Sequence, residues 1–202
     1  MLVEKTVLQL LDAFSSSAPT PGGGSASALA AATGASLLMM VAALPKTRSG
    51  ADDERGALAA AHQSLTGIRD QLTAAIDADT AAYDQVVAAY KLPKGTPEER
   101  QARRAAIQSG LRAATDVPLE VMRAADASLR EAQAIEAHGH SGAKSDVGVA
   151  VALLEAGIAG ARLNVEINLA GLADAAYVKS AREEVAALTA TGSGRPAFRP
   201  FP

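Results

Sequence analysis

Residues 22–44 read GGGSASALAAATGASLLMMVAAL, a stretch without a charged side chain that ends directly before Pro45. On length alone, such a stretch could span a bilayer. Most of its residues are Ala, Gly, Ser or Thr, however, and the strong hydrophobes gather in LLMMVAAL at its end. This composition favours a helix that is buried on all sides and packs closely through small residues. We therefore predict a helix from about Ser25 to Leu44 inside a soluble fold, with no membrane as partner.

The whole chain has the composition of a soluble globular protein, since 49% of its 202 residues are hydrophobic and 20% are charged. Because there is no cysteine, disulfides and thiolate metal sites are excluded. A net charge of −3 and an aromatic content of 3% argue against nucleic acid as a partner. The N-terminal MLVEKTVLQLLDAF carries acidic residues and lacks a basic leader, so we expect a cytoplasmic protein.

Helix formers dominate the sequence, and alternating β-branched runs are scarce. We predict an all-α, largely antiparallel bundle of about six helices, one or two of them long, as a single domain over residues 1–191. A proline-rich tail, 192–202, follows it. The predicted helices cover Val3 to Ser16, Ser25 to Leu44, Asp52 to Tyr90, Pro97 to about Ala137, Ser145 or Asp146 to about Gly171, and a last segment before the tail.

Capping signals set several of these boundaries. Asp52 or Asp53 is a candidate N-cap of the long third helix. Thr96, with Pro97 and Glu99 behind it, forms a capping box for the next helix.

Two further boundary signals lie later in the chain. Val117-Pro118 predicts a kink or restart within the fourth helix, because a residue before proline disfavours helical geometry. In the loop that follows this helix, Ser145 or Asp146 can cap the next one.

The glycine triplet Gly22, Gly23 and Gly24, followed by Ser25, leads into the charge-free helix. Unpaired backbone N–H groups at a helix start can bind an anion. The stretch matches neither the Walker pattern nor GxGxxG. The alternative is a tight connection that lets two helices or two subunits approach closely.

Asp79 and Tyr83 lie four residues apart and share a helix face, with Asp77 and Asp84 beside them. Lys94 follows just past the predicted helix end, where a cation interacts favourably with the helix dipole. Taken alone, these residues fit structural or solvated roles as well as functional ones.

The fifth predicted helix carries a stripe at three- and four-residue steps: Asp146, Ala150, Leu153, Gly157, Ala161, Asn164 and Asn168. The stripe is apolar in the middle and polar at both ends. Burying two asparagine side chains without partners is costly, so they need hydrogen bonds from neighbours, water or a ligand. The His138–His140 pair lacks a third ligand and His62 stands alone, so we predict no metal site.

Four segments together resemble the cyclodeaminase/cyclohydrolase family: APTPGGGSASALAAATGASL, DADTAAYDQVVAAYKLPKGTPEER, RAAIQSGLRAATDVPLE and SDVGVAVALLEAGIAGARLNVEINLAGLAD. The resemblance runs in order from about residue 5 to 185. This helical domain forms the C-terminus of formimidoyltransferase-cyclodeaminase and also stands alone as bacterial methenyltetrahydrofolate cyclohydrolase. The resemblance implies an all-α fold, usually a homodimer, that acts on one-carbon derivatives of tetrahydrofolate.

The family carries out two reactions. Cyclohydrolase adds water to 5,10-methenyltetrahydrofolate and gives 10-formyltetrahydrofolate, whereas cyclodeaminase closes 5-formimidoyltetrahydrofolate and releases ammonia. Because no formimidoyltransferase domain is attached, we favour the cyclohydrolase. A catalytically silent helical dimer that binds folate or a protein partner is the competing class.

The resemblance implies these site residues: Asp146, Asp79 and Lys94 as catalytic, and Gly22, Gly23, Gly24, Ser25, Asn164 and Asn168 as substrate-binding. We add Tyr83, which shares a face with Asp79. A carboxylate can activate water or stabilise the cationic substrate, and neither reaction requires a metal or nucleotide cofactor. A helix N-terminus or Lys94 can hold the anionic glutamate of folate.

Asp146 and Asn164 lie 18 residues apart on one predicted helix, hence roughly 27 Å along its axis. They cannot both reach one reacting carbon within one subunit. We therefore expect each active site to combine one end of this helix with segments of a second subunit.

Overall fold

The computed structural model describes residues 1–193, and the predicted tail 192–202 lies outside them except for its first two residues. Within this range the chain forms six helices and no extended strand, which confirms the predicted all-α bundle. The helices are α1 (Val7–Ser15), α2 (Gly23–Ala42), α3 (Asp52–Lys91), α4 (Pro97–His138), α5 (Lys144–Leu169) and α6 (Ala175–Ser193). Short 3₁₀ turns occupy Leu2–Glu4 and Ser141–Ala143.

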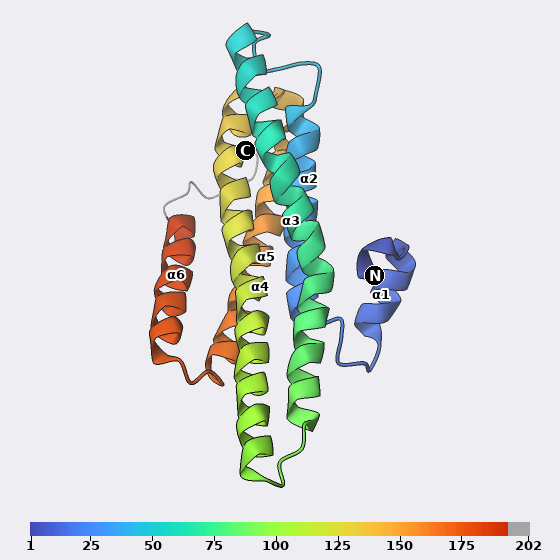
Figure 1. The fold of residues 1–202 in the computed structure, drawn as a ribbon. Helices are drawn as coiled ribbons and strands as arrows, with labels where there is room; N and C mark the ends of the chain where they lie inside the picture. Colours follow the sequence, from blue (N-terminus) through green and yellow to red (C-terminus); the bar gives the residue numbers. More distant parts are fainter. Residues whose placement is uncertain (194–202) are drawn as a thin grey trace.

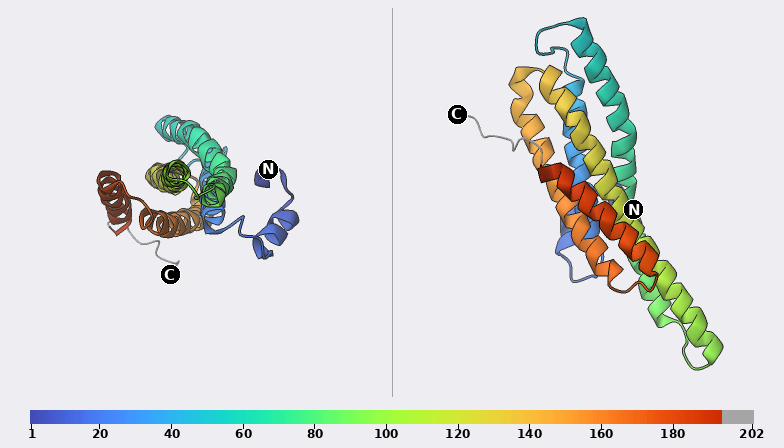
Figure 2. Two further views of the ribbon diagram at one scale, coloured as in Figure 1. Left: turned by 60° about the horizontal axis from the view of Figure 1, so that its bottom comes forward. Right: turned by 90° about the vertical axis from the view of Figure 1, so that its left-hand side faces the viewer.

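Helices α2 to α5 form the core of the molecule as an antiparallel four-helix bundle (Figure 1). Each packs along its length against two neighbours, α2 and α4 against both α3 and α5. The largest fully buried side chains come from all four helices: Leu38, Leu65, Leu72, Leu119, Met122, Ile135, Leu154 and Leu169. Helices α1 and α6 lie outside this bundle, on opposite sides of it (Figures 1 and 2).

Helix α2 is a core helix with one exposed face, so the prediction that it is buried on all sides is wrong in part. Its Ala28 and Leu38 side chains are fully buried, whereas Thr33 and Met40 are exposed. By length and composition it could cross a membrane, but 56% of its apolar window is buried inside the bundle. A mostly buried core helix of a soluble protein can have the same length and apolar composition.

Small residues let α5 approach α2 closely, as the composition predicts. A Cβ atom on Gly34 would lie 2.7 Å from the Ala150 carbonyl oxygen, closer than real Cβ contacts allow. A Cβ atom on Gly157 would lie 2.9 Å from that of Ala31. The two helices therefore pack backbone to backbone over much of their length.

The α3–α4 hairpin projects beyond the ends of α2 and α5 (Figure 2). Helix α4 runs without interruption through the buried Pro118, so the predicted restart there is wrong. Continuous packing of α4 against α3 and α5 offsets the one hydrogen bond that proline cannot donate. The Thr96 capping box is confirmed, since Glu99 N–H donates to Thr96 Oγ1 at 3.2 Å and Thr96 N–H to Glu99 Oε2 at 3.0 Å.

Two predicted caps are wrong. Helix α3 follows Ala51, and neither Asp52 nor Asp53 is its N-cap. Helix α5 follows Ala143, because a 3₁₀ turn leads directly into it, so Asp146 lies within its first turn. In both places the conformation of the segment before the helix, rather than a capping side chain, determines where the helix begins.

The α2–α3 connection is instead organised by Glu54, in the first turn of α3. Its carboxylate accepts hydrogen bonds from Thr47 Oγ1 at 2.6 Å, Ser49 N–H at 2.9 Å and Gly50 N–H at 3.1 Å. These donors, Thr47 foremost, lower the pKa of Glu54 from 4.5 to about 2. The deprotonated carboxylate thus fixes the loop against the start of α3.

Glu54→Gln is expected to lower the melting temperature at pH 7 by a few degrees, because a neutral amide accepts these bonds more weakly. Since the folded-state pKa lies below the unfolded one, this stabilisation is complete above pH 4.5 and is lost as pH falls towards 2. Thermal unfolding of wild type and variant should therefore converge at low pH. Asp53→Asn, one residue away, is the control, and an equal gap at both pH values would contradict the assignment.

Candidate functional site

Asp79 of α3 holds the start of α2. The Ser25 N–H donates to Asp79 Oδ2 at 2.8 Å, and the Ser25 hydroxyl lies 3.0 Å from the same oxygen. That hydroxyl also lies 2.9 Å from the carbonyl oxygen of Ile76, one turn earlier on α3. A carboxylate at the positive end of a helix is favourable, so Asp79 fixes the glycine turn electrostatically.

Gly24 is the glycine on which this contact depends. A Cβ atom there would lie 1.9 Å from Asp79 Oδ1, so any side chain would displace the carboxylate. Gly23 differs, because its Cβ atom would lie 3.6 Å from Asn164 Nδ2, an ordinary contact. The turn therefore requires a glycine at position 24 so that the Asp79 carboxylate can approach the backbone closely. The N–H of Ser25 is already used as a donor to Asp79.

The side-chain amides of the two asparagines of α5 donate hydrogen bonds to backbone carbonyl oxygens. Asn164 Nδ2 donates to the Gly160 carbonyl at 2.9 Å, and Asn168 Nδ2 donates to the Ala114 carbonyl of α4 at 2.7 Å. Both side chains are half-buried. The fold thus brings Gly23, Asn164 and the Asp79–Ser25 pair together from α2, α3 and α5, and we call this cluster the glycine-turn site.

Two other predicted residues lie farther along the projecting hairpin. Tyr83, one turn beyond Asp79, is 41% exposed. Lys94 follows the end of α3, and the twelve helical steps from Asp79 to Lys91 span roughly 18 Å. Lys94 there lines a cavity of about 280 Å³ with three arginines of α4, Arg100, Arg103 and Arg104. The fold does not bring Lys94 to Asp79 within one copy.

Asp146 lies at the opposite end of the bundle. It is half-buried in the first turn of α5, 18 residues and therefore roughly 27 Å before Asn164. The structure thus places Asp146 and the glycine-turn site in two separate groups, and Lys94 lies apart from both.

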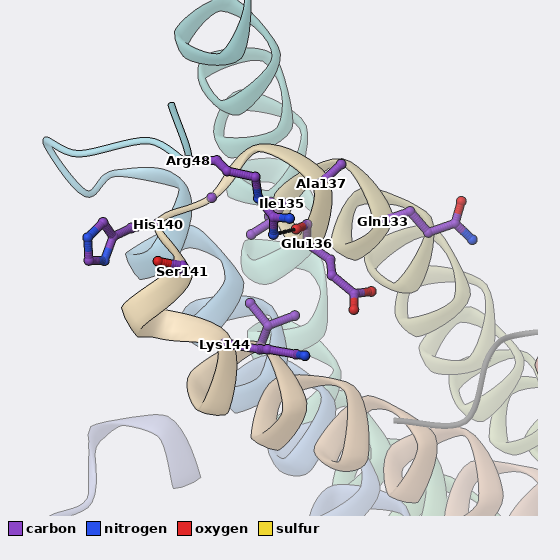
Figure 3. Close-up of a pocket in the computed structure, with 10 residues that line it drawn as sticks. Arg48, Gln133, Ile135, Glu136, Ala137, His140, Ser141 and Lys144 are labelled. Atoms are coloured by element: carbon purple, nitrogen blue, oxygen red, sulfur yellow. Dashed lines mark hydrogen bonds between the residues drawn. The ribbon is translucent and has the colours of Figure 1, made fainter. Parts of the chain in front are cut away.

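A cavity of about 780 Å³ opens beside the Asp146 end. Figure 3 shows Arg48 from the α2–α3 loop, Glu136 from α4 and Lys144 from α5 around it. The guanidinium of Arg48 donates to the Glu136 carbonyl oxygen. The backbone N–H of Arg48 donates to the His138 carbonyl oxygen at 2.9 Å. His140 also lines this space.

Arg48 and Lys144 line this end, although the sequence does not point to either of them. Neither has a local signal, because three loops and helix ends that are distant in sequence meet here. The first glycine of the HGHSG loop is a partial sequence signal for close packing at this end. This residue, Gly139, has no room for a side chain, since a Cβ atom would lie 2.5 Å from the Ile135 carbonyl oxygen. In the described part of the chain, no group of three His, Asp or Glu side chains is arranged to hold a metal.

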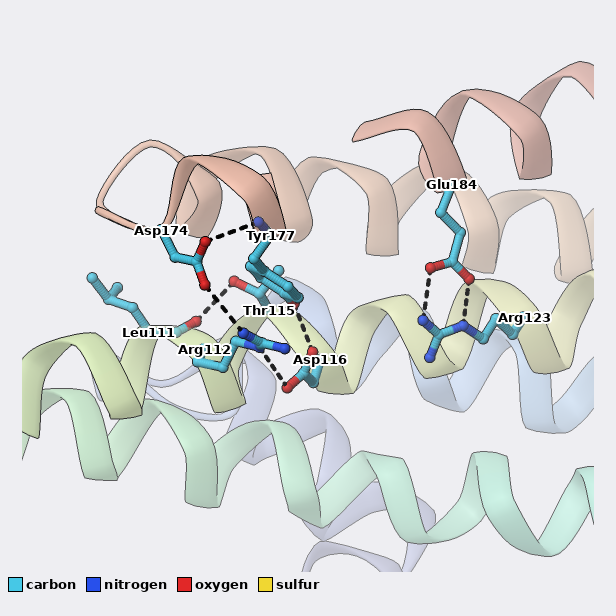
Figure 4. Close-up of polar contacts among 8 residues, drawn as sticks. All are labelled: Leu111, Arg112, Thr115, Asp116, Arg123, Asp174, Tyr177 and Glu184. Carbon is cyan, nitrogen blue, oxygen red and sulfur yellow. Dashed lines mark hydrogen bonds and ion pairs between the residues drawn. The ribbon is translucent and has the colours of Figure 1, made fainter. Parts of the chain in front are cut away.

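Polar contacts attach α6 to α4 (Figure 4). The Tyr177 hydroxyl donates to Asp116 at 2.6 Å, and the Arg112 guanidinium lies 3.5 Å from the centre of the Tyr177 ring. Burial and Asp116 raise the pKa of Tyr177, so the phenol stays protonated as a donor. Arg123 pairs with Glu184 in a two-bond contact that lowers the pKa of Glu184. These contacts stabilise the fold outside both groups of candidate residues.

Comparison with known proteins places this arrangement among folate enzymes. Residues 6–187 match the family model described as formiminotransferase-cyclodeaminase. The chain is 40% identical, over 94% of its own length and 91% of the other's, to a methenyltetrahydrofolate cyclohydrolase of Methylorubrum extorquens. It is 39% identical over 98 residues to formimidoyltransferase-cyclodeaminase of Sus scrofa, a match that covers 48% of this chain and 18% of that protein.

The fold has a solved counterpart. The crystal structure of formiminotetrahydrofolate cyclodeaminase from Thermotoga maritima superimposes with a TM-score of 0.85, covering 98% of this chain and 94% of that one, at 24% identity. At that identity the likeness establishes the shared helical fold.

Proposed function

Because the chain belongs to the formiminotransferase-cyclodeaminase family, we propose that it is a methenyltetrahydrofolate cyclohydrolase. It hydrolyses 5,10-methenyltetrahydrofolate to 10-formyltetrahydrofolate in one-carbon metabolism. The observation that carries this choice is the 40% identity with the Methylorubrum extorquens cyclohydrolase over nearly the full length of both chains.

The reaction needs a base, an acid and stabilisation of positive charge. A water oxygen attacks the methenyl carbon of the N5–C–N10 amidinium and loses a proton, which gives a neutral tetrahedral carbon. The bond from N5 to that carbon then breaks as N5 takes up a proton and the hydroxyl on the carbon loses its proton, which leaves the formyl group on N10 and releases one proton overall. Asp146 and Asp79 are the candidate proton-transfer groups, and a carboxylate beside the amidinium also stabilises its charge. No change of oxidation state occurs, so the step requires no redox cofactor.

The two candidate ends come together in a homodimer. Both helices of the α2–α5 pair carry exposed apolar side chains, Met40 on α2 and Val149, Leu163 and Ile167 on α5, the last 74% exposed, and we assign them to one α2–α5 face. This α2–α5 face is roughly 39 Å long and about 20 Å wide, which is on the order of the 800 Å² per partner that a stable interface buries. An antiparallel pairing of two such faces sets Asp146 of one copy beside the glycine-turn site of the other.

Within this shared site the remaining predicted residues have distinct roles. The glycine turn, with Ser25, Asn164 and Asn168, surrounds the pteridine-bearing part of the substrate. Tyr83 and then Lys94 follow along the projecting hairpin, and Lys94 holds the anionic glutamate end. An extended folate is long enough to reach from the turn towards Lys94, so one ligand can contact both.

The cyclohydrolase assignment is tested by the near-ultraviolet absorbance of methenyltetrahydrofolate. Purified protein is expected to accelerate the loss of that signal well above the buffer rate, and Lys94→Ala is expected to raise KM more than it lowers kcat. Arg182→Ala, on the exposed surface of α6, is the matched control. Tight folate binding without acceleration would instead identify a non-catalytic folate-binding dimer.

Cyclodeaminase activity is the second candidate, and the local identity with formimidoyltransferase-cyclodeaminase favours testing it. The same assay with 5-formimidoyltetrahydrofolate then records a gain of methenyl signal. We expect that gain to be slower than the hydrolysis, and a faster gain would reverse the assignment.

A further inference from the structure

Helix α1 has an apolar face that its own copy leaves uncovered. None of the nine residues Val7–Ser15 is buried, and Val7, Leu8 and Leu11 are 77%, 70% and 59% exposed. The face that carries Val7, Leu8 and Leu11 therefore packs on little of its own bundle. Isolated helices of this length are unstable in water, so α1 requires a covering surface to remain folded.

The position of α1 is fixed at both ends. On one side, the N–H groups of Leu2 and Val3 donate to the two carboxylate oxygens of Asp77, at 2.6 and 3.4 Å. On the other side, α1 connects through Pro19 and Pro21 to the glycine turn at the start of α2. Asp77 thus anchors the root of an arm whose helical part lies away from the bundle (Figure 1).

The nearest unpartnered apolar surface is the α2–α5 face. Figure 2 shows α6 on the α5 side and α1 on the α2 side of the α2–α5 pair, so α1 lies at the α2 edge of this pair. Four of the exposed large hydrophobic side chains among residues 1–190 belong to the face and three to α1. One partner that covers the face therefore lies within reach of α1 as well.

We propose that α1 is an arm that docks on the α2–α5 face of a second copy of this chain. The proposal rests on the homodimer proposed above. It adds a contact between α1 of one copy and the other copy to the pairing of the two α2–α5 faces. The area of the face is on the order of a dimer interface, and in a symmetric dimer each arm lies at the α2 edge of the paired faces, where it extends the contact onto the partner. Because the arm leads directly into the glycine turn, its docking also fixes the turn that Asp79 caps.

Cross-linking tests the arm directly. Leu8 is replaced by the photoreactive p-benzoylphenylalanine, and ¹⁵N-labelled and unlabelled chains are mixed, unfolded and refolded together before irradiation. Mass spectrometry is expected to find cross-links that join labelled to unlabelled chains, at residues of α2 or α5. A dimer with cross-links only within one copy would overturn the arm and leave the dimer intact, whereas a monomer by light scattering would overturn both.

A paired substitution gives the energetic test. The double variant Leu8→Ala, Leu11→Ala is expected to raise the dimer dissociation constant by at least about 100-fold, because four leucine side chains per dimer lose their cover. Asp12→Ala, on the same helix, is the control and leaves the constant unchanged. The thermal unfolding of the bundle should be retained in both variants, and an unchanged constant in the double variant would contradict the arm.

Discussion

Gly24→Ala is expected to abolish activity and to lower the free energy of unfolding by about 2–3 kcal/mol. A Cβ atom at this position lies 1.9 Å from Asp79 Oδ1, so the carboxylate must rotate away. Rotation breaks both contacts of Asp79 with Ser25, the one to its N–H and the one to its hydroxyl. The start of α2 then loses its cap, and the glycine-turn site loses its geometry.

Gly23→Ala is the matched control. Its Cβ atom meets Asn164 Nδ2 at 3.6 Å, an ordinary contact, so stability should change by less than about 1 kcal/mol. Chemical denaturation and the absorbance assay measure both variants. If Gly24→Ala and Gly23→Ala behave alike, the role assigned to the Asp79 contact is wrong.

A double variant separates sterics from chemistry. In Asp79→Ala, Gly24→Ala the clash is gone, so its loss of stability should be smaller than the sum of the two single losses. Activity should remain absent, because Asp79 itself is a candidate proton-transfer group. Additive losses of stability would mean that Gly24 and Asp79 do not act on each other.

Asp146→Asn is expected to lower kcat by about 100-fold or more with little change in stability, because the amide cannot exchange a proton with the attacking water. Asp146 is half-buried and lies within the first turn of α5, and Asn has nearly the same shape. Steady-state kinetics and thermal unfolding measure the two effects. A variant that retains kcat would remove Asp146 from the reaction.

Ser145→Ala, the neighbouring and exposed position, is the control for this variant. It tests whether any change at the start of α5 reduces turnover. Equal losses in both variants would assign the effect to local structure rather than to the carboxylate.

Much of the fold was predictable because its signals are local. Alanine- and leucine-rich segments give the six helices, LPKGTP gives the break between α3 and α4, and Thr96 and Glu99 lie three residues apart in a capping box. The predictions that are wrong concern features set by contacts between segments distant in sequence. Glu54, rather than Asp52 or Asp53, organises the start of α3 because its donors lie in a loop whose course depends on the α4–α5 connection.

The sequence offers candidate site residues, but it does not show how the fold distributes them. Asp77, Asp79 and Asp84 look alike in sequence, yet Asp77 holds the N-terminal turn and Asp79 caps α2. The partner of Asp79, Ser25, lies 54 residues away, and no local pattern marks such a contact. Helix geometry did predict the separation of Asp146 from Asn164, because rise per residue alone sets that distance.

Complementation between inactive variants tests the shared active site most directly. Asp146→Asn and Asp79→Asn chains are each assayed alone, then mixed in equal amounts, unfolded and refolded together. If each site combines Asp146 of one copy with Asp79 of the other, mixed dimers contain one intact site, and the mixture recovers about a quarter of wild-type turnover. A mixture as inactive as its two components would contradict an active site built from two copies.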